Sequence, residues 1–262
     1  PGYDKENDTI DGVPVNWVLT PNADNAYQTA LDTALDNQAD AAAADKIDIF
    51  LVEADYASKY IDDNASLALA DLGITDAALD CQYKYTQDIV TDVHGQLKGS
   101  SWQGCPGVLI YNRNYAKEVL GTDDPATVQE SVKDWATFVD TAAKMKEKGY
   151  YMVSSVNDTY RVYSNNVTSK WVENGKIQID ANMKAWVDDS KALVDGGYAN
   201  TYELWGADWS QGFFDEGKVF CYFGPAWFVD FSMHAQGDKP ADESAEDYAE
   251  QLAAWEADAN SI

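Results

Sequence analysis

Residues 14–52 read PVNWVLTPNADNAYQTALDTALDNQADAAAADKIDIFLV, in which two short apolar runs lie on either side of a helical pattern. The runs Pro14–Leu19 and Lys46–Val52 have the length and composition of strands. Between them, Asn22 or Asp24 can cap a helix whose apolar face is made of Tyr27, Ala30, Leu31, Ala34 and Leu35. Strand, helix and strand within about 40 residues predict a βαβ unit, and therefore a parallel sheet.

The same alternation continues through the second half of the chain. We expect strands at Gly107–Tyr111, Tyr151–Ser155 and Val219–Phe223. We expect helices at Tyr115–Leu120, at Val132–Lys148 with Gly149 as its cap, at Met183–Val194 closed by Gly196, and within Ser244–Ala259. The polar, breaker-rich stretch Gln236–Glu243 is predicted to be a linker or a flexible loop.

This pattern predicts an α/β fold with two lobes, each a sheet flanked by helices, joined by hinge strands. The first lobe is expected at residues 1–107, with residues 231–262 as a return segment, and the second lobe at residues 108–230. The chain would cross between the lobes near Gly104–Tyr111 and again near Gly224–Phe231. Ligands of two-lobed α/β proteins bind in the crevice at the carboxyl ends of the strands.

The composition disfavours several classes of partner. The 262 residues include 18 Lys and Arg and 45 Asp and Glu, a formal charge of −27, which repels nucleic acid and anionic lipid surfaces. No apolar run approaches the roughly 20 residues that a membrane helix needs. Nothing at Pro1 resembles a signal peptide, so we expect that any targeting segment has been removed or was never there.

The sequence contains no recognisable catalytic or metal-binding motif. The two histidines, His94 and His234, lie in no HExxH segment, and the chain has neither a GxSxG elbow nor a GxxxxGK phosphate loop. Cys81, Cys105 and Cys221 do not have zinc-site spacing. We interpret them as small buried hydrophobic residues, with a Cys105–Cys221 disulfide as the alternative. We therefore predict no catalytic residue, no metal site and no cofactor.

Aromatic residues are numerous, with nine Trp and sixteen Tyr. Sugars have polar edges and apolar ring faces, so a sugar site combines aromatic rings, which are apolar with a polar edge, and short polar side chains. Residues of both kinds occur at loop positions beside the predicted strands. The candidate ligand contacts are Asp55, Tyr56, Trp102, Gln103, Trp205, Trp209 and Trp227, with Trp17 near the end of the first strand.

Each candidate also has a purely structural interpretation. Asp55 can be a helix cap, and Trp17 fits a core position better than a ligand-facing one. Gly and Pro neighbours place Trp102 and Trp227 at bends beside strand ends, which favours a ligand-facing position. Trp205 and Trp209 fit either role. The remaining tryptophans are predicted to pack inside the fold: Trp135, Trp171, Trp186 and Trp255.

Four longer segments occur in a recognisable order. They read KIDIFLVEADYASKYID, GQLKGSSWQGCPGVLIYNRNYAKEVLG, DPATVQESVKDWATFVDTAAKMKEKG and DEGKVFCYFGPAWFVD. Together they resemble the extracellular solute-binding proteins of bacterial carbohydrate ABC transporters, the maltose-binding-protein-like family 1, over roughly Asp11–Ala235. The resemblance implies a periplasmic-binding-protein-like fold of two α/β lobes that closes over an oligosaccharide.

The resemblance also implies roles for particular residues. Trp102 and Trp227 match positions at which a ring can stack on the sugar, and Asp55 and Tyr56 fall in the loop after a family strand. Asp55 and Gln103 would hydrogen-bond to sugar hydroxyls. Two further residues, Tyr160 and Arg161 in NDTYRVY, resemble a segment of the second lobe that can face the cleft.

The family further implies a non-enzymatic receptor that works with the membrane permease subunits of an ABC transporter. We expect an extracellular or periplasmic monomer, lipid-anchored through a Cys ahead of Pro1. One departure stands out: after His234 the family runs through a long further section, whereas here an acidic linker leads directly to a terminal helix. We expect either that the sequence omits part of the natural chain or that the fold is an incomplete version.

Two other functions stay open. The same fold could bind a peptide or a cationic solute, because the strong negative charge attracts cations. A glycoside hydrolase using two carboxylates is the less favoured alternative, since among 45 acidic residues some pair must have a suitable separation.

Overall fold

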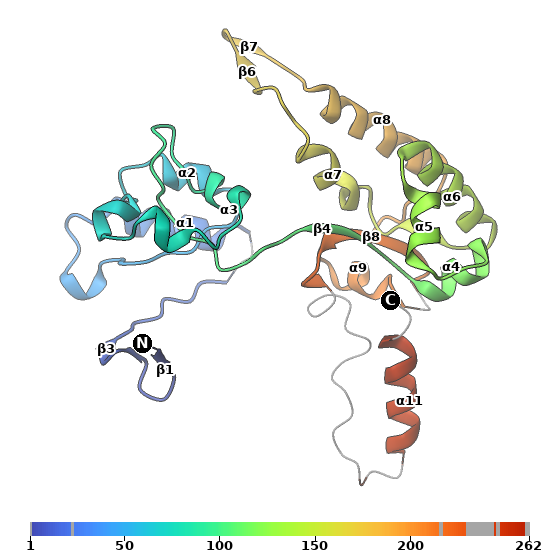
Figure 1. Ribbon diagram of the computed structural model, residues 1–262, viewed down its shortest axis with the longest axis horizontal. Helices are drawn as coiled ribbons and strands as arrows, with labels where there is room; N and C mark the ends of the chain where they lie inside the picture. The colour runs from blue at the N-terminus through green and yellow to red at the C-terminus, as the bar shows by residue number, and fades with distance from the viewer. Residues whose placement is uncertain (1, 22–23, 215–216, 229–243, 245–246, 260–262) are drawn as a thin grey trace. The chain divides into compact units, whose positions relative to one another are not determined.

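The computed structural model describes residues 2–21, 24–214, 217–228, 244 and 247–259. The chain divides into two compact units, Pro1–Gly104 and Cys105–Ile262, which we call the first and the second unit. Each unit combines helices with a small sheet (Figure 1). The predicted α/β class is therefore confirmed.

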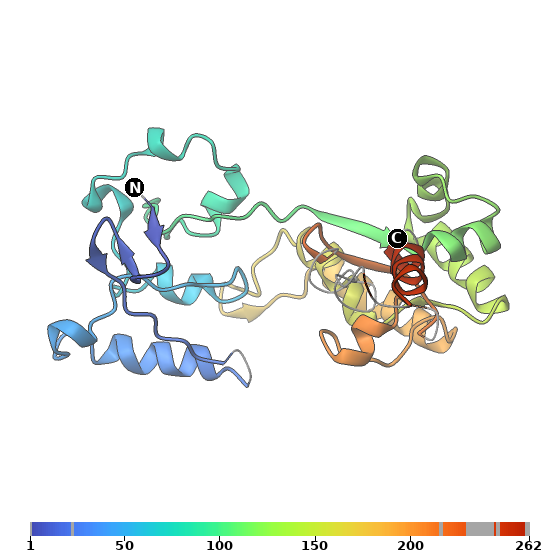
Figure 2. The same ribbon diagram turned by 90° about the horizontal axis from the view of Figure 1, so that it is seen from below.

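The first unit contains short helices and little sheet. Strands β1 (Tyr3–Asp4), β2 (Thr9–Ile10) and β3 (Val13–Pro14) form one antiparallel sheet, drawn in dark blue in Figure 2. The helices are α1 (Ala26–Asp36), α2 (Ala57–Ile61), α3 (Lys84–Asp88) and the 3₁₀ turns η1 (Ala43–Asp45), η2 (Leu69–Leu72) and η3 (Asp76–Leu79). Helices α1 and α2 are linked through Asp32, which accepts hydrogen bonds from Lys59 Nζ and Tyr60 Oη.

The prediction for residues 14–52 is confirmed only for its helix. Of the expected apolar face of α1, Leu31 is buried and Tyr27, Ala34 and Leu35 are half-buried, whereas Ala30 is exposed. Asp24 does not cap the helix. Its N-terminal neighbour is Asn25, which has a left-handed φ of 57° and makes no side-chain cap. The alternative cap, Asn22, lies outside the described residues.

The strands predicted at Pro14–Leu19 and Lys46–Val52 are wrong beyond Pro14. Residues 15–19 and the whole of Lys46–Val52 are irregular and pair with no strand among the residues that the structure describes. An isolated strand is unstable, because its backbone groups need the hydrogen bonds of a neighbouring strand. Leu19 and Ile49 are accordingly 87% and 84% exposed, and the predicted βαβ unit is not formed.

The second unit is built on a three-stranded sheet. Strands β4 (Gly107–Tyr111), β8 (Val219–Pro225) and β5 (Tyr151–Val153) lie in that order, with β8 antiparallel to β4 and parallel to β5. All three predicted strands are confirmed to within two residues at their ends. The sheet is mixed rather than purely parallel.

Helices cover both faces of this sheet, because neighbouring strand residues point to opposite sides. Helices α4 (Arg113–Leu120), α5 (Pro125–Val132), α6 (Trp135–Glu147) and α8 (Ala181–Asp195) contribute to one core cluster, which includes Phe138, Met145, Leu193 and Phe220. On the other side, α9 (Ala207–Gln211) and the residues after it contribute Trp209 and Phe213 to a cluster with Ile110 and Tyr222.

The predicted helices of this unit are confirmed, except that one of them is divided into two. The segment Val132–Lys148 is split, because Val132 ends α5 and α6 begins at Trp135. Asp134 sets this boundary through a capping box: its Oδ1 accepts from the backbone N–H of Thr137 at 2.8 Å, and Thr137 Oγ1 accepts from the backbone N–H of Asp134.

Several shorter elements complete the unit. These are the 3₁₀ helix η4 (Val156–Thr159), α7 (Tyr160–Ser164), the strands β6 (Val172–Glu173) and β7 (Lys176–Ile177), and α11 (Tyr248–Ala259), which confirms the predicted terminal helix. The predicted linker Gln236–Glu243 lies outside the described residues. Within the described part of the chain, no helix has both the length and the apolar character needed to span a bilayer.

The interpretation of the cysteines is right for Cys221 alone. Cys221 is a free thiol inside the sheet, where its Sγ donates to the carbonyl oxygen of Met152 at 3.2 Å. Cys81 and Cys105 are exposed, so they are not core residues. The Cys105–Cys221 disulfide, the alternative left open by the sequence, is not formed.

Candidate functional site

Two tryptophans form an exposed stacked pair on the second unit. The rings of Trp205 and Trp227 are nearly parallel, with an interplanar angle of 15° and centroids 5.8 Å apart. Trp205 is 55% exposed and Trp227 is half-buried. We call Trp205 and Trp227 the tryptophan pair. The sequence singles out each of them as a candidate contact, and the structure brings them together.

The local backbone holds the pair in place. Trp227 follows the end of β8 by two residues, and Trp205 lies in the turn before α9. Trp205 has a φ of 70°, in the left-handed region that a bulky side chain rarely adopts. Such a conformation costs about 1–3 kcal/mol, and residues that adopt it tend to cluster at functional sites. The strained backbone at Trp205 therefore supports the tryptophan pair as a candidate functional site.

Buried aromatic rings support the pair from below. The centroid of Trp209 lies 5.2 Å from that of Trp205, and Phe228 packs edge-on at 5.1 Å from Trp205 and 4.9 Å from Trp227. Trp209 and Phe228 are only 1% and 2% exposed. Trp209, also a candidate contact from the sequence, thus underlies the pair instead of presenting a ring face to solvent.

The indole of Trp209 is bound to a buried carboxylate. Its Nε1 donates to Asp158 Oδ1 at 2.6 Å, while Asp158 Oδ2 accepts from the backbone N–H of Ser155 at 2.8 Å. Asp158 is 4% exposed. Burial raises the pKa of Asp158 from 3.8 to about 7, although the hydrogen bonds from Trp209 and Ser155 act in the opposite direction. Asp158 therefore changes its charge near neutral pH.

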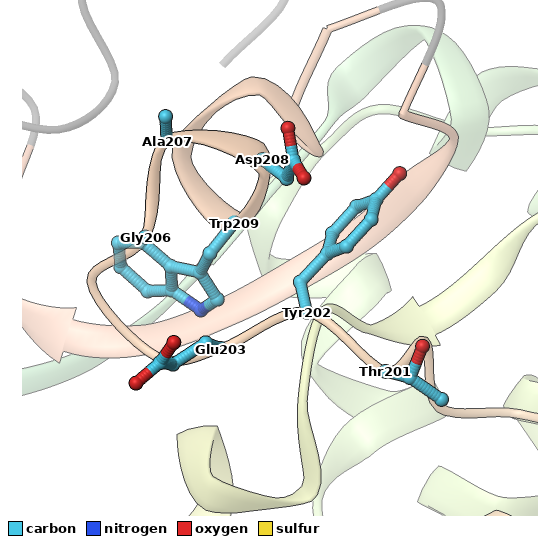
Figure 3. Close-up of a pocket in the computed structure, with 7 residues that line it drawn as sticks. All are labelled: Thr201, Tyr202, Glu203, Gly206, Ala207, Asp208 and Trp209. Atoms are coloured by element: carbon cyan, nitrogen blue, oxygen red, sulfur yellow. The ribbon is translucent and has the colours of Figure 1, made fainter.

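An open pocket of about 490 Å³ adjoins Trp209. Figure 3 shows the lining residues, which come from the loop before α9 and from α9 itself. In that view the ring of Tyr202 and the carboxylate of Asp208 extend to the same side. The carboxylates of Glu203 and Asp208 can accept charge-assisted hydrogen bonds from hydroxyl or ammonium groups. The full lining is Thr201, Tyr202, Glu203, Gly206, Ala207, Asp208 and Trp209.

Five of the predicted contacts lie in the first unit, Trp17 among them. Trp102 is 72% exposed, which leaves its ring available to a ligand. Gln103 and Asp55 are exposed as well. Tyr56 is half-buried and packs edge-on against Tyr60, with centroids 6.2 Å apart. Tyr56, rather than Asp55, is the residue that directly precedes α2.

Trp17 is not a core residue. It is 58% exposed, and its Nε1 donates to Tyr3 Oη at 3.2 Å. The ring of Tyr3 contacts it edge-on, with centroids 5.9 Å apart. The core interpretation of Trp17 fails because the strand in which it was expected does not form.

Tyr160 and Arg161 belong to a packed corner of the second unit. Tyr160 contacts the ring of Trp186 edge-on at 5.1 Å, and the guanidinium of Arg161 lies over the ring of Tyr160 at 5.7 Å. Trp186 Nε1 donates to Thr159 Oγ1 at 3.2 Å, which ties α8 to η4. These contacts explain the position of Tyr160 by packing within the second unit.

The packing role is confirmed for Trp135 and Trp186. Trp135 stacks on Tyr163 with centroids 4.7 Å apart, and Trp186 makes the contacts described above. The packing role is wrong for Trp171, which is 58% exposed. Sequence reasoning missed Asp158, although the spacing Ser155-x-x-Asp158 is a visible capping signal. No local pattern pointed to its contact with Trp209, 51 residues away.

Comparison with known proteins gives the chain its family. The family model for the "Bacterial extracellular solute-binding protein" matches residues 4–255. No curated protein matches the chain. Among solved structures, the chain is similar to the crystal structure of an "Extracellular solute-binding protein family 1", with a TM-score of 0.65 and 17% sequence identity.

The structural match covers 80% of this chain and 53% of the solved one, so the chain spans about half the length of that protein. At this level of identity the match establishes the fold, which is that of a solute-binding protein. The family model covers nearly the whole chain and agrees with the resemblance found in the sequence segments. The chain belongs to the bacterial extracellular solute-binding proteins.

Proposed function

We propose that this protein is the substrate-binding receptor of an ABC importer and that it captures an oligosaccharide. The observation that carries the proposal is the tryptophan pair, whose two rings are stacked, partly solvent-exposed and held over a buried aromatic layer. A soluble receptor gains nothing in stability from exposing an indole in a strained backbone conformation. The exposed indole is explained if a ligand with apolar faces covers it on binding.

The chemistry around the pair favours a sugar. A pyranose ring has an apolar face that can lie on an indole and hydroxyl groups around its edge. The neighbouring pocket offers the carboxylates of Glu203 and Asp208 and the hydroxyl of Tyr202 as hydrogen-bond partners. A carboxylate that accepts from a sugar hydroxyl makes a charge-assisted bond, which is stronger than a neutral one.

The candidates of the first unit are part of the same proposal. Trp102 supplies a second stacking surface, because it is largely exposed. Asp55 and Gln103 are proposed to bind hydroxyls, and Tyr56 to contribute ring contact.

The family also suggests where the receptor works. We propose that it acts outside the cytoplasm as a monomer, delivers its ligand to membrane permease subunits, and is held at the membrane by a lipidated Cys ahead of Pro1. The family description supports the extracellular setting. Growth of the producing cells with radioactive palmitate, followed by recovery of the protein, tests the anchor: we expect label in the protein, and an unlabelled protein would contradict the anchor.

The central experiment is calorimetric titration with maltotetraose, cellotetraose and xylotetraose. We expect one of these sugars to bind, and we expect Trp205→Ala and Trp227→Ala each to weaken that binding about tenfold or more, the equivalent of about 1.4 kcal/mol. Trp171→Ala is the matched control, because Trp171 is as exposed as Trp205 and lies in the same unit. Binding of no sugar by a folded chain, or equal losses in all three variants, would contradict the proposal.

A cationic solute is the second candidate. The pocket beside Trp209 carries two carboxylates, and the chain has a net charge of −27. Carboxylates attract and orient cations. Spermidine and a lysine-rich peptide should therefore be titrated in parallel with the sugars. If one of them binds and binding is lost in Glu203→Gln but retained in Trp227→Ala, the cationic ligand is the right one.

A further inference from the structure

Asp158 is a buried carboxyl group with hydrogen-bond donors on both oxygens, and one of the donors is the indole of another buried side chain. Trp209 Nε1 donates to Oδ1, and the backbone N–H of Ser155 donates to Oδ2. The salt bridges of the described residues do not include Asp158. An aspartate at this position costs stability when charged, so its presence calls for a role that a neutral residue could not fill.

The contacts of Trp209 indicate that role. The centroid of its ring lies 5.2 Å from that of Trp205, and the ring of Phe228 packs edge-on against it with centroids 5.6 Å apart. Trp205 in turn stacks on Trp227. A direct chain of contacts therefore runs from the buried carboxylate, through the buried indole, to the exposed tryptophan pair.

We propose that Asp158 is a positioning residue: its carboxylate fixes the orientation of Trp209, and through Trp209 it sets the geometry of the tryptophan pair, so that protonation of Asp158 changes a surface that it does not touch. The link to ligand binding rests on the proposed function. The positioning itself does not, since it concerns only contacts within the second unit.

The ionised form of Asp158 holds these two donors most strongly. A carboxylate accepts charge-assisted hydrogen bonds through both oxygens, whereas protonation removes the negative charge and takes up part of the acceptor capacity of one oxygen. Protonation therefore weakens the hydrogen bonds from the Trp209 and Ser155 N–H groups. Of these two donors, the Trp209 indole belongs to a side chain, so its orientation is the one that we expect to change. Because burial raises the pKa of Asp158 to about 7, its carboxyl group changes protonation state near neutral pH.

The titratable groups that interact with Asp158 from β8 do not compete for this titration, and two charged groups of α7 and α8 have other partners. Cys221 and Tyr222 of β8 both have pKa values raised by burial, so they stay neutral well above neutral pH. On α7 the guanidinium of Arg161 lies over the ring of Tyr160. The carboxylate of Asp189 on α8 accepts from Tyr163 Oη at 2.6 Å.

Nuclear magnetic resonance of the indole N–H groups tests the proposal on the full chain. Each of the nine tryptophans has one indole N–H, and single Trp→Phe variants can assign its signal. We expect the Trp209 signal to titrate with a midpoint near pH 7 and the signals of Trp205 and Trp227 to follow with the same midpoint. The Trp135 signal, from the opposite core cluster, should not follow it.

Asp158→Asn should abolish these three titrations, because an amide does not ionise and offers one acceptor where two are needed. Asp180→Asn is the matched control: Asp180 is also a buried carboxylate that accepts backbone N–H groups, but it caps α8. It should leave the titrations intact. If Asp158→Asn does not fold, Trp209→Phe keeps a buried ring and removes the donor, and it should uncouple Trp205 and Trp227 from pH.

The outcomes separate the two proposals. If the Trp209 signal shifts with pH but the Trp205 and Trp227 signals do not, the positioning role is overturned. It is also overturned if the Trp209 signal does not change with pH. If a sugar binds, its affinity should change around the same midpoint in the native chain but not in Asp158→Asn. A chain that binds no sugar but shows the common midpoint would refute the proposed function and support the role of Asp158.

Discussion

The charge on Asp158 should reduce the stability of the fold, and this cost can be measured. Below pH 3.8 the carboxyl group is protonated in both the folded and the unfolded chain. Between 3.8 and about 7 the folded chain holds a proton that the unfolded chain has lost. The contribution of Asp158 is therefore fully present at low pH, and it is lost as the pH rises through the folded pKa.

The size of the effect follows from the two pKa values. The gap between 3.8 and about 7, at about 1.4 kcal/mol per pH unit, corresponds to about 4 kcal/mol. Asp158→Asn has no proton to lose. We therefore expect the free energy of unfolding of Asp158→Asn, relative to the native chain, to rise by about 4 kcal/mol between about pH 4 and about pH 8.

Urea unfolding followed by tryptophan fluorescence measures this difference, because seven of the nine tryptophans belong to the second unit. Subtracting the two curves removes the titration of the other carboxylates. A constant difference across the pH range would refute the reasoning. It would mean that Asp158 has an ordinary pKa in the folded chain, and that water or a partner reaches it.

The remaining predictions concern the core, a helix end and the thiols. Leu193→Ala should lower the free energy of unfolding by about 2–5 kcal/mol in urea, because Leu193 is 1% exposed in the main core; a loss near zero would show that α8 is not packed as described. Asp134→Ala should lower the same free energy of unfolding by about 1 kcal/mol, because it removes the cap of α6. Asp134→Ser keeps a capping oxygen and should retain most of that stability, and equal losses in the two variants would contradict the capping role. A thiol reagent should modify exposed Cys81 in the native chain and reach Cys221 only after unfolding, because burial also raises the pKa of that thiol; equal rates would contradict the buried position.

The second unit could be predicted from the sequence because its signals are local. The strands at Gly107–Tyr111 and Val219–Pro225 are short apolar runs, and α6 and α8 have regular apolar faces with recognisable ends. Gly149 marks the end of α6 as expected, whereas Asp134, which caps its start, divides the segment that was expected to be one helix from Val132. Each of these features depends on residues within a few positions of one another.

The first unit could not be predicted in the same way. Pro14–Leu19 and Lys46–Val52 have the composition of strands, but a strand also needs a neighbour in space. Beyond Pro14, no strand of the described chain pairs with either segment, so Trp17 and Ile49 remain exposed. Composition indicates what a segment can become, and pairing decides whether it does.

By itself, the sequence determined the α/β class, most elements of the second unit and the membership of the solute-binding family, because these depend on periodicity and on motif order along the chain. It also marked Trp205 and Trp227 as separate candidates. Only the tertiary structure placed them in one stack above Trp209, and joined Trp209 to Asp158 across 51 residues. Contacts of that kind arise when β8, η4 and α9 pack together, and no spacing within one segment encodes them.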